Sequence, residues 1–116
     1  MGNRANESDI IFYLEKVKRL IAAGKYDFVP RRKNMQALAQ HGLTIKDAKA
    51  EILELVVGDY YKGPKQDLDP NRPGDIWEFK KQVDRTQFYV KVKIVKENGE
   101  DILKCLGFHE DDLFRR

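Results

Sequence analysis

The stretch that decides the fold is TQFYVKVKIVKENGEDILKCLGFH, residues 86–109. Apolar and polar residues alternate through 86–96 and again through 101–109, as they do in strands that bury one face. Between the two runs stands Asn98-Gly99, a dipeptide typical of hairpin turns. A third alternating run, 75–81, precedes them. The sequence therefore predicts an antiparallel meander of three strands in the C-terminal half.

The turn of this hairpin decides which strand faces combine, because a shift of one residue turns a strand over. A two-residue turn would place His109 beside Phe88 on the apolar face. A three-residue loop, with Gly99 left-handed in a bulge, pairs Phe88 with Phe108 instead. The three-residue loop buries more apolar volume, so we expect it, with Lys104 as its one misfit.

In the expected register, Trp77 and Phe79 join the apolar face, and the opposite face becomes polar and basic. Its polar side chains are an exposed carboxylate, a phenol, an imidazole and three lysines: Glu78, Tyr89, His109, Lys80, Lys91 and Lys93. Residues 76–96 hold six Lys or Arg against two acids, although the net charge of the whole chain is only +3. A basic sheet surface of this kind is the electrostatic footprint expected for a phosphate backbone.

Several simpler interpretations compete with a catalytic site. Alternating lysines are more often a solvated strand face, or a guard against edge-to-edge aggregation. The same face could serve a non-catalytic RNA-binding module, and an exposed edge strand could accept a partner strand in a protein-interaction domain. Acid, phenol, imidazole and lysines together are nevertheless what acid–base chemistry on a phosphodiester requires.

The N-terminal half has helical periodicity. Ser8 is suited to cap a first helix that ends at Gly24. The core face of this helix carries apolar residues at helical spacing: Ile10, Leu14, Val17 and Ile21. A short extended segment, 26–29, follows, and Asn34 is then a good N-cap for a second helix that closes at Gly42.

Thr44 and Asp47 form a capping-box pattern that opens a third helix, ended by Gly58. The apolar positions expected to be buried in the second and third helices are Met35, Leu38, Ala39, Ile45, Ala48, Ile52, Leu55 and Val56. A loop rich in proline then runs through 59–74, and loops of this length are often functional. Helices followed by a meander predict an α+β fold, N-terminal helices packed on a C-terminal antiparallel sheet, in one domain over 1–116.

Length and composition exclude other classes. A chain of 116 residues is too short for an α/β barrel and matches one domain of ordinary size. No apolar run approaches the ~20 residues that cross a bilayer, and the polar start 1–9 does not resemble a secretory leader. One cysteine excludes an internal disulfide, and one cysteine with two histidines argues against structural zinc. We therefore expect a cytoplasmic protein with no metal, no cofactor and no membrane association.

Several segments resemble, in order and spacing, the MqsR-family toxins of bacterial type II toxin–antitoxin systems. These segments are DYYKGP at 59–64, IWEF at 76–79, FYVKVK at 88–93, VKRLIAAG at 17–24 and LGFH at 106–109. The resemblance implies a RelE-like fold and an endoribonuclease (mRNA interferase) that cleaves mRNA without a metal. It also implies a cognate antitoxin protein as partner.

Carried over by position, the resemblance implies an active site of Lys62, Glu78, Tyr89 and His109. The best-known branch has glutamine in place of Glu78 and lysine in place of His109. Alternation alone already places three of the four residues on one face, whereas Lys62 lies in the predicted loop.

RNA supplies its own nucleophile, the 2′-OH, so the protein needs a base, an acid and cations. Glu78 is the candidate base and His109 the general acid, since imidazole side chains exchange protons near neutral pH. Tyr89 would hydrogen-bond a non-bridging oxygen or stack on a base, while Lys62 and Lys91 would stabilise the phosphorane. The cations expected to hold flanking RNA are Arg31, Arg32, Lys33, Lys80 and Lys93. For the Arg31–Lys33 run, a solvated lead-in to the helix is an equal alternative.

Overall fold

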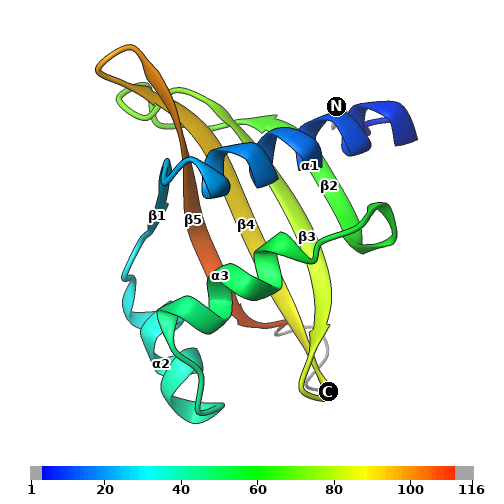
Figure 1. The fold of residues 1–116 in the computed structure, drawn as a ribbon, viewed down its shortest axis with the longest axis vertical. Helices are drawn as coiled ribbons and strands as arrows, with labels where there is room; N and C mark the ends of the chain where they lie inside the picture. Colours follow the sequence, from blue (N-terminus) through cyan, green and yellow to red (C-terminus); the bar gives the residue numbers. More distant parts are fainter. Residues whose placement is uncertain (1–3, 112–116) are drawn as a thin grey trace.

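The computed structural model describes residues 4–111. In chain order the elements are α1 (Glu7–Ala22), β1 (Tyr26–Phe28), α2 (Arg32–Gln40), α3 (Ile45–Leu53), the 3₁₀ turn η1 (Val57–Asp59), β2 (Tyr60–Gln66), β3 (Asp75–Val83), β4 (Thr86–Glu97) and β5 (Glu100–Glu110). Within these residues the strands form one sheet in the order β1-β5-β4-β3-β2, in which β1 is parallel to β5 and the other pairs are antiparallel. The predicted α+β layout is confirmed (Figure 1).

Helices α1 and α3 cross the same face of the sheet, and α2 lies at the end of β1, next to β5 (Figure 1). The core fills the space between the helices and this face. Its largest fully buried side chains are Phe79, Phe88, Phe108, Ile52, Leu55, Leu103, Val17, Val90, Val92, Asn34 and Cys105. We call the other side of β2–β5, away from α1 and α3, the open face.

The helix predictions hold for the core faces and fail at some boundaries. In α1 the four expected residues are buried, but the side chain of Asn6, not Ser8, accepts from the Asp9 N–H as N-cap. The Thr44–Asp47 capping box is confirmed by hydrogen bonds in both directions. Helix α3 ends at Leu53, before the predicted end. Because the short α2 and α3 each bury only a narrow stripe, three positions expected in the core are exposed: Met35, Ala39 and Ile45. Val56, also expected in the core, lies beyond the end of α3 and is exposed as well.

The prediction of Asn34 as a helix cap is wrong. The N-cap of α2 is Arg31, three residues before the predicted cap, and Asn34 is 1% exposed within the helix. The Asn34 amide donates to the carbonyls of Val29 and Leu106 at 3.1 and 3.0 Å and accepts from the Phe108 N–H at 3.0 Å. A side-chain amide carries the same donor and acceptor as a peptide group. Asn34 therefore continues the ladder along β5 beyond the point where β1 ends, at Phe28.

We expect Asn34→Ala to lower the free energy of unfolding by about 2–4 kcal/mol, because it leaves buried backbone groups of β5 without partners. Urea unfolding followed by circular dichroism measures this change. The matched control is Gln36→Ala on the exposed side of the same helix, for which we expect a change within about 0.5 kcal/mol. Equal stabilities of the two variants would contradict the assigned role of Asn34.

The predicted loop 59–74 contains strand β2, which follows directly on η1, and the segment 67–74 remains as a loop between β2 and β3. Strand β2 pairs with β3 through Tyr60–Phe79, Lys62–Glu78 and Lys65–Ile76, with register shifts between these pairs. Gly63 has φ +119°, and a Cβ there would lie 2.6 Å from the Ile76 carbonyl oxygen. Because of the irregular register and the Gly63-Pro64 step, the sequence of β2 does not show the alternation of apolar and polar residues from which the other strands were predicted.

The predicted three-residue hairpin loop is also wrong. Asn98 and Gly99 alone form the turn, both with positive φ, so Leu103 and Cys105 face the core. A bulge at Leu106 then reverses the parity of β5, because Val92 pairs with Cys105 whereas Lys91 pairs with Gly107.

The bulge restores the predicted face for the end of β5. Phe108 pairs with Val90 and is fully buried, while His109 pairs with Tyr89 on the open face. Lys104 is no misfit, since it faces away from the core and its Nζ lies 2.7 Å from Asp27 Oδ2.

Candidate active site

Two rows of residues run across the open face, because directly paired residues of neighbouring strands point to the same side. The first row contains Lys62 on β2, Glu78 on β3, Lys91 on β4 and Gly107 on β5. The second row contains Lys80, Tyr89 and His109. The structure thus brings together all four residues of the predicted catalytic set, including Lys62, which the sequence placed in a loop.

Glu78 and Tyr89 form a close pair inside the site. The Tyr89 hydroxyl donates to Glu78 Oε1 at 2.6 Å, and Lys65 Nζ lies 3.4 Å from Glu78 Oε2. Glu78 is only 3% exposed, so the expectation of an exposed carboxylate is wrong. Burial, and then the hydrogen bond to Glu78, raise the pKa of Tyr89 well above its ordinary value. Tyr89 is consequently a neutral phenol whose proton is held by a carboxylate.

His109 lies beside Tyr89, with ring centroids 5.3 Å apart. His109 Nδ1 is 2.9 Å from the Glu110 carbonyl oxygen. A carbonyl only accepts, so Nδ1 carries the proton and Nε2 is the nitrogen left to exchange one. The hydrogen bond to the backbone fixes the ring and assigns the chemistry of His109 to Nε2.

Gly107 forms the floor between these two rings. An ideal Cβ at Gly107 would lie 3.7 Å from His109 Nε2, 3.7 Å from Tyr89 Cε2 and 3.2 Å from Lys91 Cβ. Glycine therefore leaves open the space that Nε2 and the phenol share. Gly107 was not among the predicted site residues, although the glycine within LGFH was a visible signal.

Tyr61 was also missed as a site residue. Its ring lies under two cations, with Lys80 Nζ 4.0 Å and Lys62 Nζ 5.3 Å from the centroid. Lys80 Nζ is also 3.0 Å from Asp111 Oδ2. Contacts between ammonium groups and an aromatic face are favourable and hold both lysines at the edge of the site. The aromatic pair in DYYKGP was the available signal.

The residues predicted to bind flanking RNA differ in accessibility. Arg31, Arg32 and Lys33 are exposed at the start of α2, and Lys91 is half-buried in the first row. Lys93 is 3% exposed, because its Nζ donates to Asp67 Oδ2 at 2.8 Å and to the Arg72 carbonyl at 2.7 Å. The loop 67–74 thus covers this lysine, contrary to the expectation of an open lysine face.

The arrangement contains a proton acceptor, a phenol, an imidazole and several ammonium groups within two adjacent rows. This set can move protons and stabilise an anion at one small centre. Among residues 4–111, no group of three or more His, Cys, Asp or Glu side chains is placed to hold a metal ion. Over the same residues, no helix is both long enough and apolar enough to span a bilayer.

Comparison with known proteins gives one family. The family model described as motility quorum-sensing regulator, toxin of MqsA, matches residues 10–110, from the first turn of α1 to the end of β5. The matched segment includes both rows of the open face. A search of curated proteins gives no match. Since the family model covers most of the chain, the protein belongs to the MqsR toxin family and is the toxin of a toxin–antitoxin system.

Proposed function

We propose that this toxin is a metal-independent endoribonuclease of the cytoplasm, which cleaves mRNA through the 2′-OH and is neutralised by a cognate antitoxin. The observation that carries the proposal is the contact of Tyr89 with both Glu78 and His109, inside rows that also hold Lys62 and Lys91. RNA brings its own nucleophile, so the protein has to supply a base, an acid and positive charge.

The first step removes the proton of the 2′-OH. Glu78 is buried, whereas the half-exposed Tyr89 presents its hydroxyl from the same hydrogen-bonded pair. The Tyr89 oxygen accepts the 2′-OH proton while the Tyr89 proton passes to Glu78. Because burial and the bond to Glu78 raise the pKa of Tyr89, the phenol does not work as a free phenolate, and Glu78 is the final acceptor.

The 2′-oxygen then attacks the adjacent phosphorus, and charge accumulates on the non-bridging oxygens. Lys62 and Lys91 flank Glu78 in the first row and stabilise this charge. Lys80 takes part from the neighbouring row, where Tyr61 and Asp111 hold it.

The last step breaks the bond between phosphorus and the 5′-oxygen. His109, protonated at Nε2, gives its proton to this oxygen, so the products are a 2′,3′-cyclic phosphate and a 5′-hydroxyl. Proton exchange with water returns Glu78 to the carboxylate and His109 to the imidazolium. Arg31, Arg32 and Lys33 hold flanking phosphates, while the buried Lys93 acts by fixing the loop 67–74.

The chemical identity of the product ends tests this proposal. A long transcript is cleaved, its ends are mapped, and a short RNA containing a mapped site is made with a single 2′-deoxy sugar before the scissile phosphate. We expect no cleavage of that RNA, full cleavage when the deoxy sugar stands two positions away, cyclic phosphate ends, and unchanged rates in EDTA. Cleavage of the first deoxy RNA, or loss of activity in EDTA, would contradict the mechanism. Binding without any cleavage would favour the RNA-binding module.

A further inference from the structure

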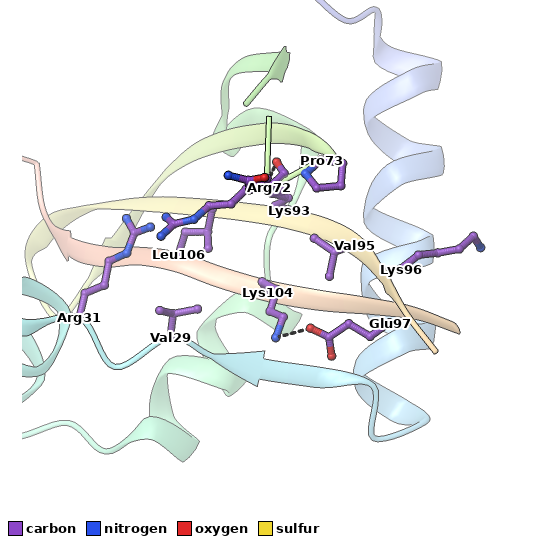
Figure 2. A pocket seen from close by; sticks show the side chains of 11 residues that line it. Val29, Arg31, Arg72, Pro73, Lys93, Val95, Lys96, Glu97, Lys104 and Leu106 are labelled. Atoms are coloured by element: carbon purple, nitrogen blue, oxygen red, sulfur yellow. Dashed lines mark hydrogen bonds and ion pairs between the residues drawn. The ribbon is translucent and has the colours of Figure 1, made fainter. Parts of the chain in front are cut away.

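A second hollow, to whose apolar lining the mechanism above gives no role, lies on the open face beside the two rows. It encloses about 420 Å³ between β4, β5, the segment after β1 and the loop 67–74 (Figure 2). We call it the Val95 pocket. Its apolar lining residues are Val29, Val95 and Leu106, and cationic side chains surround them.

The Val95 pocket lies on the same face of the sheet as the site, further along β4 and β5. Val95 lies on the same face of β4 as Lys91, four residues further along, and Leu106 directly precedes Gly107, the floor of the site. Along a strand, residues i and i+2 lie on the same face and are about 7 Å apart. Val95 is therefore about 14 Å from Lys91 along β4, and a single RNA strand that places a phosphate over the first row reaches this pocket with a nearby nucleotide.

Most of the cations around the pocket are already paired. Lys93 is held by Asp67, Lys96 lies 3.0 Å from Asp101, and Lys104 lies 3.0 Å from Glu97. A track of phosphates needs several free cations, and these lysines do not provide them. The pocket consequently differs from a plain phosphate-binding groove.

The guanidinium groups remain available. Among the described residues Arg31 has no ion-pair partner, and Arg72 Nε lies 3.3 Å from Oδ2 of the half-buried Asp69. Figure 2 shows the side chains of Arg31 and Arg72 reaching over Leu106 from opposite sides. A planar guanidinium stacks on aromatic rings and also contacts phosphate. A pocket with an apolar floor and guanidinium groups above it is suited to bind a planar aromatic ring that is linked to an anionic group.

We propose that the Val95 pocket binds one nucleobase of the single-stranded RNA, near the phosphate that is cut. The base lies on Val95 and Leu106, and the guanidinium groups of Arg31 and Arg72 contact its ring and its phosphate. This inference rests on the proposed RNA substrate. If the pocket binds a base in this way, Val95 and Arg31 help to determine which phosphodiester of the RNA is placed in the active site.

Binding of uncleavable RNA tests the pocket independently of catalysis. The probes are fluorescent 2′-O-methyl octamers of adenosine, cytidine, uridine or inosine, together with an octamer of abasic sugars that carries the same number of phosphates. Affinities of the full chain are measured by anisotropy for the wild type and for Val95→Lys. The matched control, Ile45→Lys, makes the same change in a hollow lined by Tyr26 and Lys49, which lies away from the two rows.

We expect the wild type to bind at least one base-bearing octamer about tenfold more tightly than the abasic octamer. Val95→Lys removes this preference while keeping or raising affinity for the abasic octamer, because it replaces the apolar floor with a charge. Ile45→Lys keeps the preference. A thermal melt of each variant confirms that it is folded.

Two results would overturn the proposal that the Val95 pocket binds a base. One is that the wild type binds base-bearing and abasic octamers equally, or binds neither. The other is that Val95→Lys keeps the wild-type preference for base-bearing octamers. Failure of the proposed nuclease function is seen separately, in the cleavage assay with long RNA. A preference for bases without any cleavage would support the pocket and reject the nuclease.

Discussion

His109→Ala should lower the rate of RNA cleavage by about 10²-fold or more and leave the free energy of unfolding close to that of the wild type. The loss follows from the assigned role, because no other imidazole borders Tyr89 and Gly107 among the described residues to protonate the leaving oxygen. His109 is half-buried on the open face, and its Nδ1 bonds to the carbonyl of its own neighbour. Removing it therefore takes little from the core.

The matched control is His41→Ala, which removes the other histidine of the chain. His41 packs edge-on against Phe88, with ring centroids 5.0 Å apart, and its Nε2 lies 3.7 Å from Glu110. This residue is outside the two rows. We expect His41→Ala to alter stability more than the cleavage rate.

An RNA in which sulfur replaces the bridging 5′-oxygen separates an acid from a residue that only shapes the site. A thiolate leaves without being protonated, so this RNA needs no general acid. We expect His109→Ala to cleave it at nearly the wild-type rate. If His109→Ala cleaves the sulfur-substituted RNA as slowly, relative to the wild type, as it cleaves normal RNA, His109 is not the general acid and contributes only to the shape of the site.

The shared face of Tyr89 and His109 was predicted from alternation, but the path to it contained two errors that compensate. The hairpin turn has two residues instead of three, which turns β5 over, and the bulge at Leu106 turns the end of β5 back. Phe108 therefore faces the core as predicted, but it pairs with Val90 and not with Phe88. Both arrangements shift the strand by one residue, so both give the same parity at the end of β5. Alternation alone cannot locate a bulge, since an extra residue leaves the pattern on each side of it intact.

Other features depend on contacts between distant segments, which a local pattern does not contain. Asn34 has the sequence of a helix cap, but it is used as a substitute strand because β1 ends early beside β5. Lys93 has the alternation of an exposed lysine, yet the loop 67–74 folds over it and pairs it with Asp67. In both cases a polar group found its partner through tertiary structure. The burial of Glu78 beneath Tyr89 and Lys65 has the same origin.

Tyr89→Phe and Glu78→Gln should each lower cleavage by about 10²-fold or more, and the double variant should be no worse than the more damaging single one. Residues that act as one unit show such non-additive losses, because removing either member stops the same proton transfer. The amide introduced by Glu78→Gln keeps an oxygen that accepts from Tyr89 but cannot take up its proton. The Tyr89→Phe change keeps the ring beside His109 and removes only the hydroxyl.

The stability of the two single variants distinguishes loss of the proton transfer from Tyr89 to Glu78, which we call the relay, from simple misfolding. Tyr89→Phe leaves a buried carboxylate whose remaining ion-pair partner within the described residues is the partly exposed Lys65, which costs about 1–3 kcal/mol. Glu78→Gln keeps the hydrogen bond and costs less. If misfolding caused the loss of activity, the less stable Tyr89→Phe variant would lose more activity than Glu78→Gln. A relay predicts similar losses of activity in the two variants despite their different stabilities.

Tyr61→Phe is the control for loss of a phenol on the open face, since it keeps the ring that contacts Lys80 and Lys62. We expect nearly wild-type cleavage from it. Losses that multiply in the Glu78→Gln, Tyr89→Phe double variant would show that the two groups act independently. Glu78 would then have to take the proton of the RNA directly, which its burial beneath Tyr89 and Lys65 opposes.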